Sequence, residues 1–122
     1  MEIAATLFMR GSDVITGWRR LHSEHALVLD AQGDRLIMLN PFAAVPTAHV
    51  VTTPGRMWTA SCPWDAFGIC SALHEPGTIE TPCPDCGEVI TIENEPGAPL
   101  DDTLLFHSLL PASRWWDDIV FT

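Results

Sequence analysis

The chain has no lysine and only six arginines against sixteen acidic residues, which gives a formal net charge of −10. That charge repels phosphate backbones and anionic membrane surfaces, so we expect no nucleic-acid partner. No uncharged apolar run approaches the roughly 20 residues that a membrane-spanning helix needs, so no membrane partner is expected either. The first ten residues lack a basic front end and a small-residue cleavage pattern. We therefore expect no export signal and a soluble, cytoplasmic protein.

Several motifs of common enzymes are also missing. The sequence has no Gly-rich phosphate loop and no Gly-x-Ser-x-Gly, which argues against nucleotide binding and serine hydrolysis, and we expect no organic cofactor. It has no internal repeat and no low-complexity segment. With 122 residues, 47% of them hydrophobic, it is long enough for one domain with a core and too short for two of ordinary size.

The first part of the chain predicts a helix followed by a hairpin. Ser12 or Asp13 can cap a helix whose apolar residues recur at helical spacing to about His22. Two apolar runs, 26–30 and 35–39, then flank a turn in which Gly33 suits a positive φ. A helix that leads into a hairpin is typical of the end of a winged-helix unit. Without a basic recognition face, we interpret it as scaffolding.

The remainder predicts a small sheet packed on a helix. Residues 41–47 form a connector with proline near both ends, and a helix is expected over 63–73 because Pro63 suits the first helical position. Strands are expected at 49–52, 78–82, 87–93 and, more weakly, 104–110, with an amphipathic segment after Pro111. The predicted fold class is α+β. It is one domain, with a winged-helix remnant over 1–40 and a mixed or antiparallel sheet packed on a helix over 41–122.

Two reactive side chains fall at the start of the predicted 63–73 helix. Cys62 would occupy the N-cap and Asp65 the third helical position, close together at the positive end of the helix dipole. The dipole favours a thiolate and should make Cys62 the most reactive thiol, while the carboxylate disfavours a second negative charge, so the pair should compete for one proton. Spacing alone favours the simpler alternative, in which Cys62 is a small buried hydrophobe and Asp65 an ordinary first-turn acid.

A second pair of cysteines has the spacing of a zinc knuckle. Cys83-Pro-Asp-Cys86 followed by glycine could supply two thiolates to a tetrahedral metal, but it is only half of a site. Cys70 is expected to be packed in the core, so any further ligand would come from the histidines at 49, 74 and 107. We favour a tight turn with two free thiols over bound zinc. Trp115-Trp116 is expected to cover the core, with an aromatic pocket lining as the less favoured alternative.

Five segments together resemble the alkylmercury lyase (organomercurial lyase) family, from about Leu21 to the last residue. They are 27–30, the run Asn-Pro-Phe-Ala-Ala-Val-Pro-Thr at 40–47, Cys62-x-x-Asp65, the Thr-Pro-Cys-Pro-Asp-Cys-Gly hairpin at 81–87, and Trp-Trp-Asp-Asp-Ile-Val-Phe-Thr at 115–122. The resemblance implies protonolysis of carbon–mercury bonds, with mercury bound by cysteine thiolates as the substrate metal. Cys62 matches the first mercury-binding cysteine, Asp65 the proton donor, and Cys83 a structural cysteine.

The resemblance also places the second mercury-binding cysteine just beyond Thr122, after the last residue of this chain. The chain would then be a fragment, a shortened relative that uses another thiol, or a relative that has lost this chemistry. Two other functions stay open. One is a zinc-stabilised or thiol-bearing interaction module around Cys83 and Cys86, and the other is a family relative with a different small-molecule lyase or hydrolase reaction. The expected partner is a small thiophilic molecule. The sequence does not indicate an oligomeric state.

Overall fold

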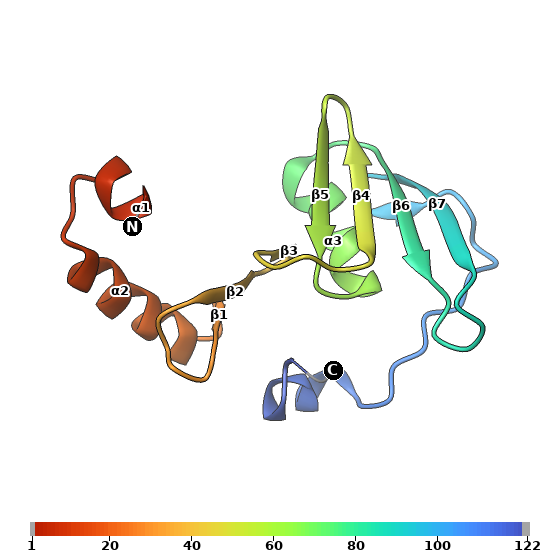
Figure 1. Ribbon diagram of the computed structural model, residues 1–122. Helices are drawn as coiled ribbons and strands as arrows, with labels where there is room; N and C mark the ends of the chain where they lie inside the picture. Colours follow the sequence, from red (N-terminus) through yellow and green to blue (C-terminus); the bar gives the residue numbers. More distant parts are fainter. Residues whose placement is uncertain (1, 121–122) are drawn as a thin grey trace.

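The computed structural model describes residues 2–120, which form three α-helices, eight strands and one 3-10 helix (Figure 1). In chain order these are α1 (Glu2–Thr6), α2 (Gly11–Ser23), β1 (Val28–Leu29), β2 (Leu36–Leu39), β3 (Phe42–Ala43), β4 (His49–Thr53), β5 (Arg56–Ala60), α3 (Pro63–Leu73), β6 (Gly77–Pro82), β7 (Val89–Glu95), β8 (Ala98–Pro99) and η1 (Ala112–Asp117). No helix in this range is long and apolar enough to cross a membrane.

All eight strands join one sheet in the order β1-β2-β3-β5-β4-β6-β7-β8. Every pairing in it is antiparallel, which confirms the α+β class and resolves the predicted mixed or antiparallel sheet as antiparallel. The β2–β3 pairing carries the sheet across residue 40, the predicted boundary between the winged-helix remnant and the rest. The two parts of the chain therefore share backbone hydrogen bonds.

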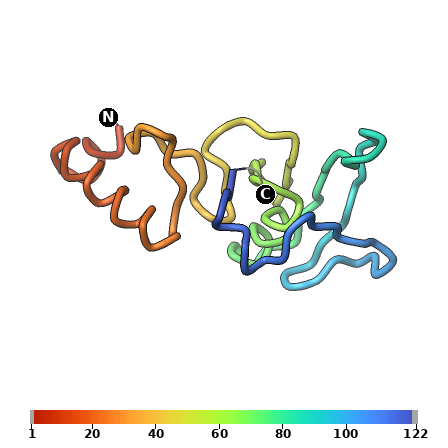
Figure 2. The backbone as a smooth tube through the Cα atoms, turned by 90° about the horizontal axis from the view of Figure 1, so that it is seen from below, coloured from red at the N-terminus to blue at the C-terminus, as the bar shows by residue number. Residues whose placement is uncertain are grey.

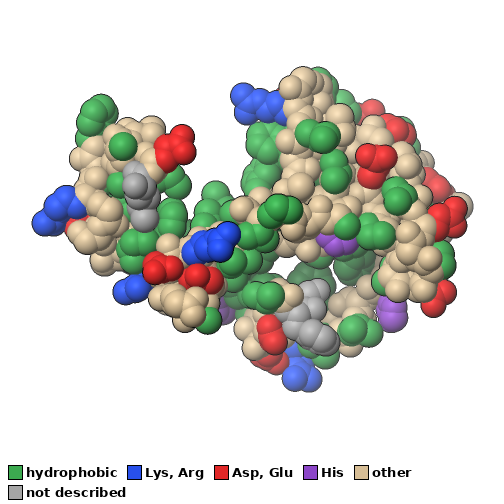
Figure 3. Space-filling model, viewed as in Figure 1, with side chains coloured by type: hydrophobic (Ala, Val, Ile, Leu, Met, Phe, Trp, Pro, Cys, Tyr) green, Lys and Arg blue, Asp and Glu red, His purple; other side chains and the backbone are tan. Residues whose placement is uncertain are grey.

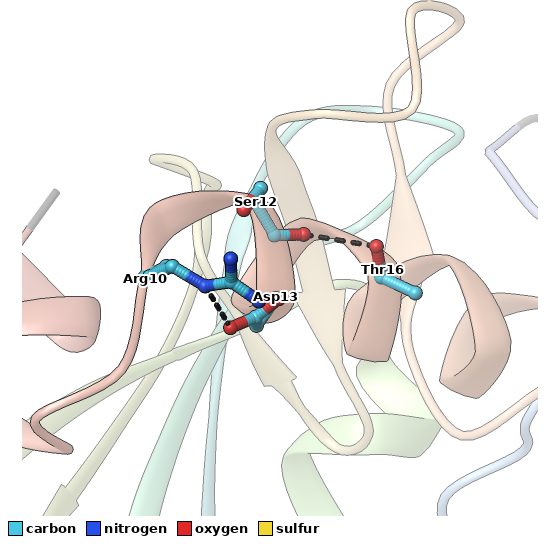
Figure 4. Close-up of polar contacts among 4 residues, drawn as sticks. All are labelled: Arg10, Ser12, Asp13 and Thr16. Atoms are coloured by element: carbon cyan, nitrogen blue, oxygen red, sulfur yellow. Dashed lines mark hydrogen bonds and ion pairs between the residues drawn. The ribbon is translucent and has the colours of Figure 1, made fainter.

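Helix α2 begins slightly earlier than its sequence pattern predicts. Its N-cap is Arg10, not Ser12 or Asp13. Asp13 instead lies in the first turn and accepts two hydrogen bonds from the Arg10 guanidinium, at 2.9 and 3.1 Å, and the Thr16 hydroxyl donates to the Ser12 carbonyl (Figure 4). The negative charge of Asp13 thus sits where it favours the helix dipole. Val14 is the residue that this helix buries.

The hairpin β1–β2 forms as predicted, with Gly33 at a φ of +71°. The Asp30 side chain accepts hydrogen bonds from the backbone amides of Asp34 and Arg35, which fixes the turn. In Figure 1 this hairpin and the two N-terminal helices lie to one side of the larger sheet and α3. The N-terminal unit thus forms an extension of the sheet.

The main core lies between α3 and the central strands. The buried residues of this core come from α3, β4, β5, β6 and β7, and they are Val51, Ala60, Ala66, Ile69, Cys70, Ile79 and Ile92. Helix α3 spans the predicted residues, with Pro63 in its first turn and His74 at its C-cap in the left-handed region. Cys70 is fully buried, as predicted. Because α3 is anchored along its length, its N-terminus is held in a fixed position over the sheet.

Two segments differ from the sequence-based expectation. Residues 56–60 form β5, which pairs with β4 through a turn at Gly55, whereas no strand was predicted there. Residues 104–110 form no strand, and Leu105 is 96% exposed. This segment runs back beneath α3 as extended coil (blue in Figure 2), and Trp64 of α3 contacts Phe106 at a ring distance of 5.5 Å. The apolar residues that suggested a strand therefore pack, in part, on the helix.

Candidate functional site

Cys62 and Asp65 lie together at the start of α3. Cys62 is the N-cap, with an extended backbone at φ −152° and ψ 172°, and Asp65 lies in the first turn, as the sequence predicts. Both side chains are half-buried. The Cys62 thiol makes no capping hydrogen bond of standard geometry. Its sulfur still interacts with the backbone amides of Asp65 and Trp64 in the first turn.

Each of the two groups holds its proton more tightly than it would in water. Burial raises the pKa of the Cys62 thiol, the amides of Asp65 and Trp64 oppose this, and the Asp65 carboxylate adds to it. Burial also raises the pKa of Asp65, against a smaller lowering by its side-chain interaction with Cys62. The pair therefore competes for a proton, as expected. The raised pKa runs against the expectation that Cys62 is the most reactive thiol, because burial outweighs the helix amides.

The pair opens into a cavity of about 660 Å³ between the sheet and the C-terminal segment. Figure 3 shows this hollow beneath the sheet, with hydrophobic side chains around it. Its lining comes from the first hairpin, the 40–49 connector, the start of α3, the β6–β7 turn and residues 106–120. Ligand pockets in proteins are of this size and are mostly apolar with a few polar groups. The arrangement suits a small apolar molecule that carries one thiophilic centre.

Aromatic residues close the cavity on the C-terminal side. Trp64 meets Trp115 edge-on at a centroid distance of 6.3 Å, and Trp116 stacks on His25 at 4.2 Å with its ring nearly parallel. Both Trp115 and Trp116 line the cavity. The pocket-lining interpretation of the Trp115-Trp116 pair, the less favoured one from sequence, is therefore confirmed.

His49, which the sequence indicated only as a possible zinc ligand, lines the cavity of Cys62 and Asp65. It is half-buried at the start of β4, and its Nδ1 lies 2.8 Å from the Thr81 hydroxyl. Burial lowers the pKa of His49, which favours the neutral ring at pH 7. The histidine therefore adds a polar group but no fixed positive charge near Cys62. Its position at the first residue of a strand, beside a buried threonine, arises only from the fold.

Cys83 and Cys86 lie in the β6–β7 turn, and neither lines the cavity, although Pro82 and Pro84 on either side of Cys83 do. Cys83 is half-buried and Cys86 is exposed. Amides of Cys86 and Asp85, together with the Cys86 side chain, lower the pKa of the Cys83 thiol. Within residues 2–120 no group of three or more His, Cys, Asp or Glu side chains could hold a metal ion. Among these residues, the histidines at 49, 74 and 107 therefore form no such group with Cys83 and Cys86.

Comparison with known proteins identifies relatives of this arrangement. The family model described as alkylmercury lyase matches residues 42–122, more than half of the chain. Among solved structures, the mercury-bound form of MerB2 matches with a TM-score of 0.59 and 18% sequence identity, over 82% of this chain and 48% of that one. The chain thus spans about half the length of that relative, which shares its fold. A search of curated proteins gives no match.

The matched region includes three of the five segments that carried the resemblance in sequence, together with residues 42–47 of a fourth. It contains the start of α3 with Cys62 and Asp65, the β6–β7 turn and the closing tryptophans. Phe121 and Thr122, at the end of the closing segment, lie outside the described residues. The Cys62–Asp65 cavity therefore lies within the part of the chain that the family model covers.

Proposed function

The chain belongs to the alkylmercury lyase family, and from that premise we propose that its Cys62 cavity binds an organomercury cation and supports protonolysis of the carbon–mercury bond. The observation that supports this most is the shared position of a half-buried thiol and a carboxyl of raised pKa at one helix start, inside an apolar cavity. Thiolate is the ligand that soft metal ions prefer. The apolar lining suits the organic group.

In the first step the Cys62 sulfur displaces a thiol from the incoming alkylmercury adduct. A mercury–sulfur bond to Cys62 forms, the bond to the departing thiolate breaks, and the Cys62 proton must leave. Asp65 is the adjacent acceptor, since its raised pKa makes its carboxylate a better base than an exposed aspartate. The departing thiolate takes a proton from solvent. At the end of this step the mercury is bound to the Cys62 sulfur and the proton to the Asp65 carboxylate.

In the second step Asp65 returns this proton to carbon. The electron pair of the carbon–mercury bond becomes the new carbon–hydrogen bond, the hydrocarbon leaves, and mercury stays as a dication on the Cys62 thiolate. Donation of electron density by thiolate ligands makes the carbon more basic, so a second thiolate should speed this step. We propose that Asp65 is the general acid and Cys62 the ligand that holds mercury throughout.

The second thiolate must come from a residue or molecule beyond those lining the cavity. Among the cavity's described lining residues, Cys62 is the one cysteine. Ile119 and Val120 line the same cavity, so a cysteine following Thr122 would start from a backbone already close to it. A cytoplasmic thiol such as glutathione is the other donor, and we place the protein in the cytoplasm because thiols there remain reduced.

Retention of methylmercury under thiol challenge tests this proposal. The protein is loaded with one equivalent of methylmercury, exposed to excess glutathione, and analysed by native mass spectrometry with peptide mapping. We expect the adduct that survives to lie on Cys62, because the cavity shields it from exchange. Cys62→Ser should lose that adduct and the matched variant Cys83→Ser should keep it. An adduct retained on Cys83 or Cys86 alone would instead favour the thiol-bearing interaction module.

A further inference from the structure

A second cavity, of about 570 Å³, lies beside the first, on the other side of Trp64. It is bounded by α3, by β7 and β8, and by residues 104–107. The two cavities share a wall made of Pro63, Trp64, Pro82, Pro84, Phe106 and His107. Neither Cys62 nor Asp65 lines this second cavity, so the mercury chemistry proposed above makes no use of it.

One buried polar side chain in this cavity has no partner. Asn94 on β7 is 3% exposed, and both its amide nitrogen and its carbonyl oxygen lack a hydrogen bond within the described part of the chain. Buried amide groups in native proteins are nearly always paired, so one that is orphaned at both atoms calls for a specific explanation. Asn94 also lines the cavity. Both atoms have almost no accessible surface of their own, so an incoming molecule can pair with them only when the side chains around Asn94 move aside.

The neighbours of Asn94 explain why the fold leaves it unpaired. It stands opposite Gly77 on β6 and Pro99 on β8. Glycine has no side chain to offer, and proline has no backbone N–H. Asn94 follows Ile90 and Ile92 on the same face of β7, so it ends an otherwise apolar row that points toward α3. A residue with a hydrocarbon side chain would fit this row without an energetic cost for unmet hydrogen bonds.

The chemistry of the lining specifies the ligand. None of the described lining residues is Asp, Glu, Lys or Arg, and His107 is the one titratable side chain among them, so the lining offers no fixed charge to a ligand. A carboxamide offers one donor and one acceptor side by side, and its complement is a molecule with an N–H next to a C=O. The wall at 104–107 is loosely packed, with Leu105 96% and Phe106 45% exposed, which leaves the cavity accessible. From these features we propose that the Asn94 cavity is a binding site for a neutral, largely apolar cyclic amide, held by a two-point hydrogen bond to Asn94.

The test uses the whole chain and 2-quinolinone, an aromatic lactam, as the probe, followed by ¹⁵N–¹H correlation spectra. We expect saturable shifts at Asn94, Ile92 and Ser71. N-methyl-2-quinolinone, which lacks the N–H, should bind at least about tenfold more weakly, since an unmatched buried polar group is strongly penalised. This probe pair needs no variant. It tests the hydrogen bond in the native protein.

Two matched variants locate the effect. Asn94→Leu should weaken 2-quinolinone by the same factor as N-methylation while the protein stays folded, because the change removes an unpaired polar group. Asn40, the chain's other asparagine, lines the Cys62 cavity, so Asn40→Leu should leave the affinity for 2-quinolinone unchanged. Equal binding of the two probes, full affinity in Asn94→Leu, or shifts confined to the Cys62 cavity would overturn the proposal. So would protein dimerisation through this face that excludes the probe.

Discussion

Cys62 and Cys83 differ in the environments that control their thiol pKa values. Cys62 is half-buried beside a carboxylate, and burial is the largest cause of its raised pKa. Cys83 sits in a turn whose amides of Cys86 and Asp85 stabilise its thiolate and lower its pKa. The thiolate is the nucleophile in alkylation. The two cysteines should therefore respond differently to a simple electrophile.

We predict that iodoacetamide at neutral pH alkylates Cys83 before Cys62, and Cys70 last. The physical reason is the larger thiolate fraction of Cys83 and the complete burial of Cys70. Peptide mapping by mass spectrometry at increasing times gives the order. Alkylation of Cys62 first would show that the helix N-terminus dominates over burial after all.

The buried carboxyl of Asp65 should also affect stability in a pH-dependent way. Its folded-state pKa is raised above the ordinary value of 3.8, so the folded protein favours the protonated carboxyl. This contribution favours folding below pH 3.8 and is lost as the pH rises through the folded pKa. At neutral pH the ionised carboxylate of Asp65 therefore lowers the free energy of unfolding.

We predict that Asp65→Asn raises the free energy of unfolding at pH 7 and has little effect below pH 3.8. Urea denaturation at the two pH values measures the difference. Glu80→Gln, an exposed carboxylate on β6, is the matched control and should change neither value. A loss of stability in Asp65→Asn at pH 7 would mean that the carboxylate is stabilised by interactions that outweigh its burial.

At the scale of elements, α3 meets β6 by a close approach at Gly77. A Cβ at this position would lie 2.8 Å from the Cys70 sulfur and 3.2 Å from the Thr52 carbonyl oxygen. The helix and the strand are thus held together through a residue without a side chain. Since α3 carries Cys62 and Asp65 at its other end, this contact sets where the site lies relative to the sheet.

We predict that Gly77→Ala destabilises the protein by about 1–3 kcal/mol, the usual cost of overpacking a core. Cys70→Ala removes the nearer of the two obstacles. The double variant should therefore lose less stability than the sum of the losses in the two single variants. Thermal or urea unfolding of the parent, the two single variants and the double variant gives the four free energies of this double-mutant cycle. Strict additivity would show that the Thr52 carbonyl, not the sulfur, is the obstacle.

The sequence predicted most of the elements that position the site, because each had local features. Pro63 and the acid at 65 fixed the helix start, and Gly33 fixed the first turn. Strand β5 was missed because Arg56, Met57 and Trp58 do not alternate cleanly between apolar and polar. Residues 104–110 are apolar because part of this segment covers α3, and not because they form a strand. Tertiary packing of this kind leaves no periodic pattern.

The candidate site was predictable in part. The Cys62–Asp65 pair followed from one helix start, and the structure places both residues in one cavity. His49 and the second cavity around Asn94 were not predictable, because each depends on strands that are distant in sequence. The raised pKa of Cys62 was missed for the same reason. The C-terminal segment, which contacts Trp64 at this helix start, is distant from it in sequence.

At the scale of the molecule, the cavity is closed by parts from both ends of the chain. His25, just after α2, stacks on Trp116, and the C-terminal segment that carries Trp116 passes beneath α3 (Figure 2). The net charge of −10 favours approach of cations, organomercury among them. We propose that residues 1–122 act as one domain, because the sheet and this closure both join the N-terminal unit to the rest.

The central claim, that Asp65 delivers the proton to carbon, is tested most directly by hydrocarbon release. Methane is measured from a methylmercury–glutathione adduct with the chain as given, and with the chain extended by one cysteine after Thr122. We expect binding with slow release for the first and faster release for the second, because a second thiolate increases the basicity of the carbon. Asp65→Asn in the extended chain should lower the rate at least ~100-fold, the usual contribution of a general acid. Asp85→Asn, an exposed carboxylate in the β6–β7 turn, should not. Methane release by the extended Asp65→Asn protein at the parent rate would contradict the account.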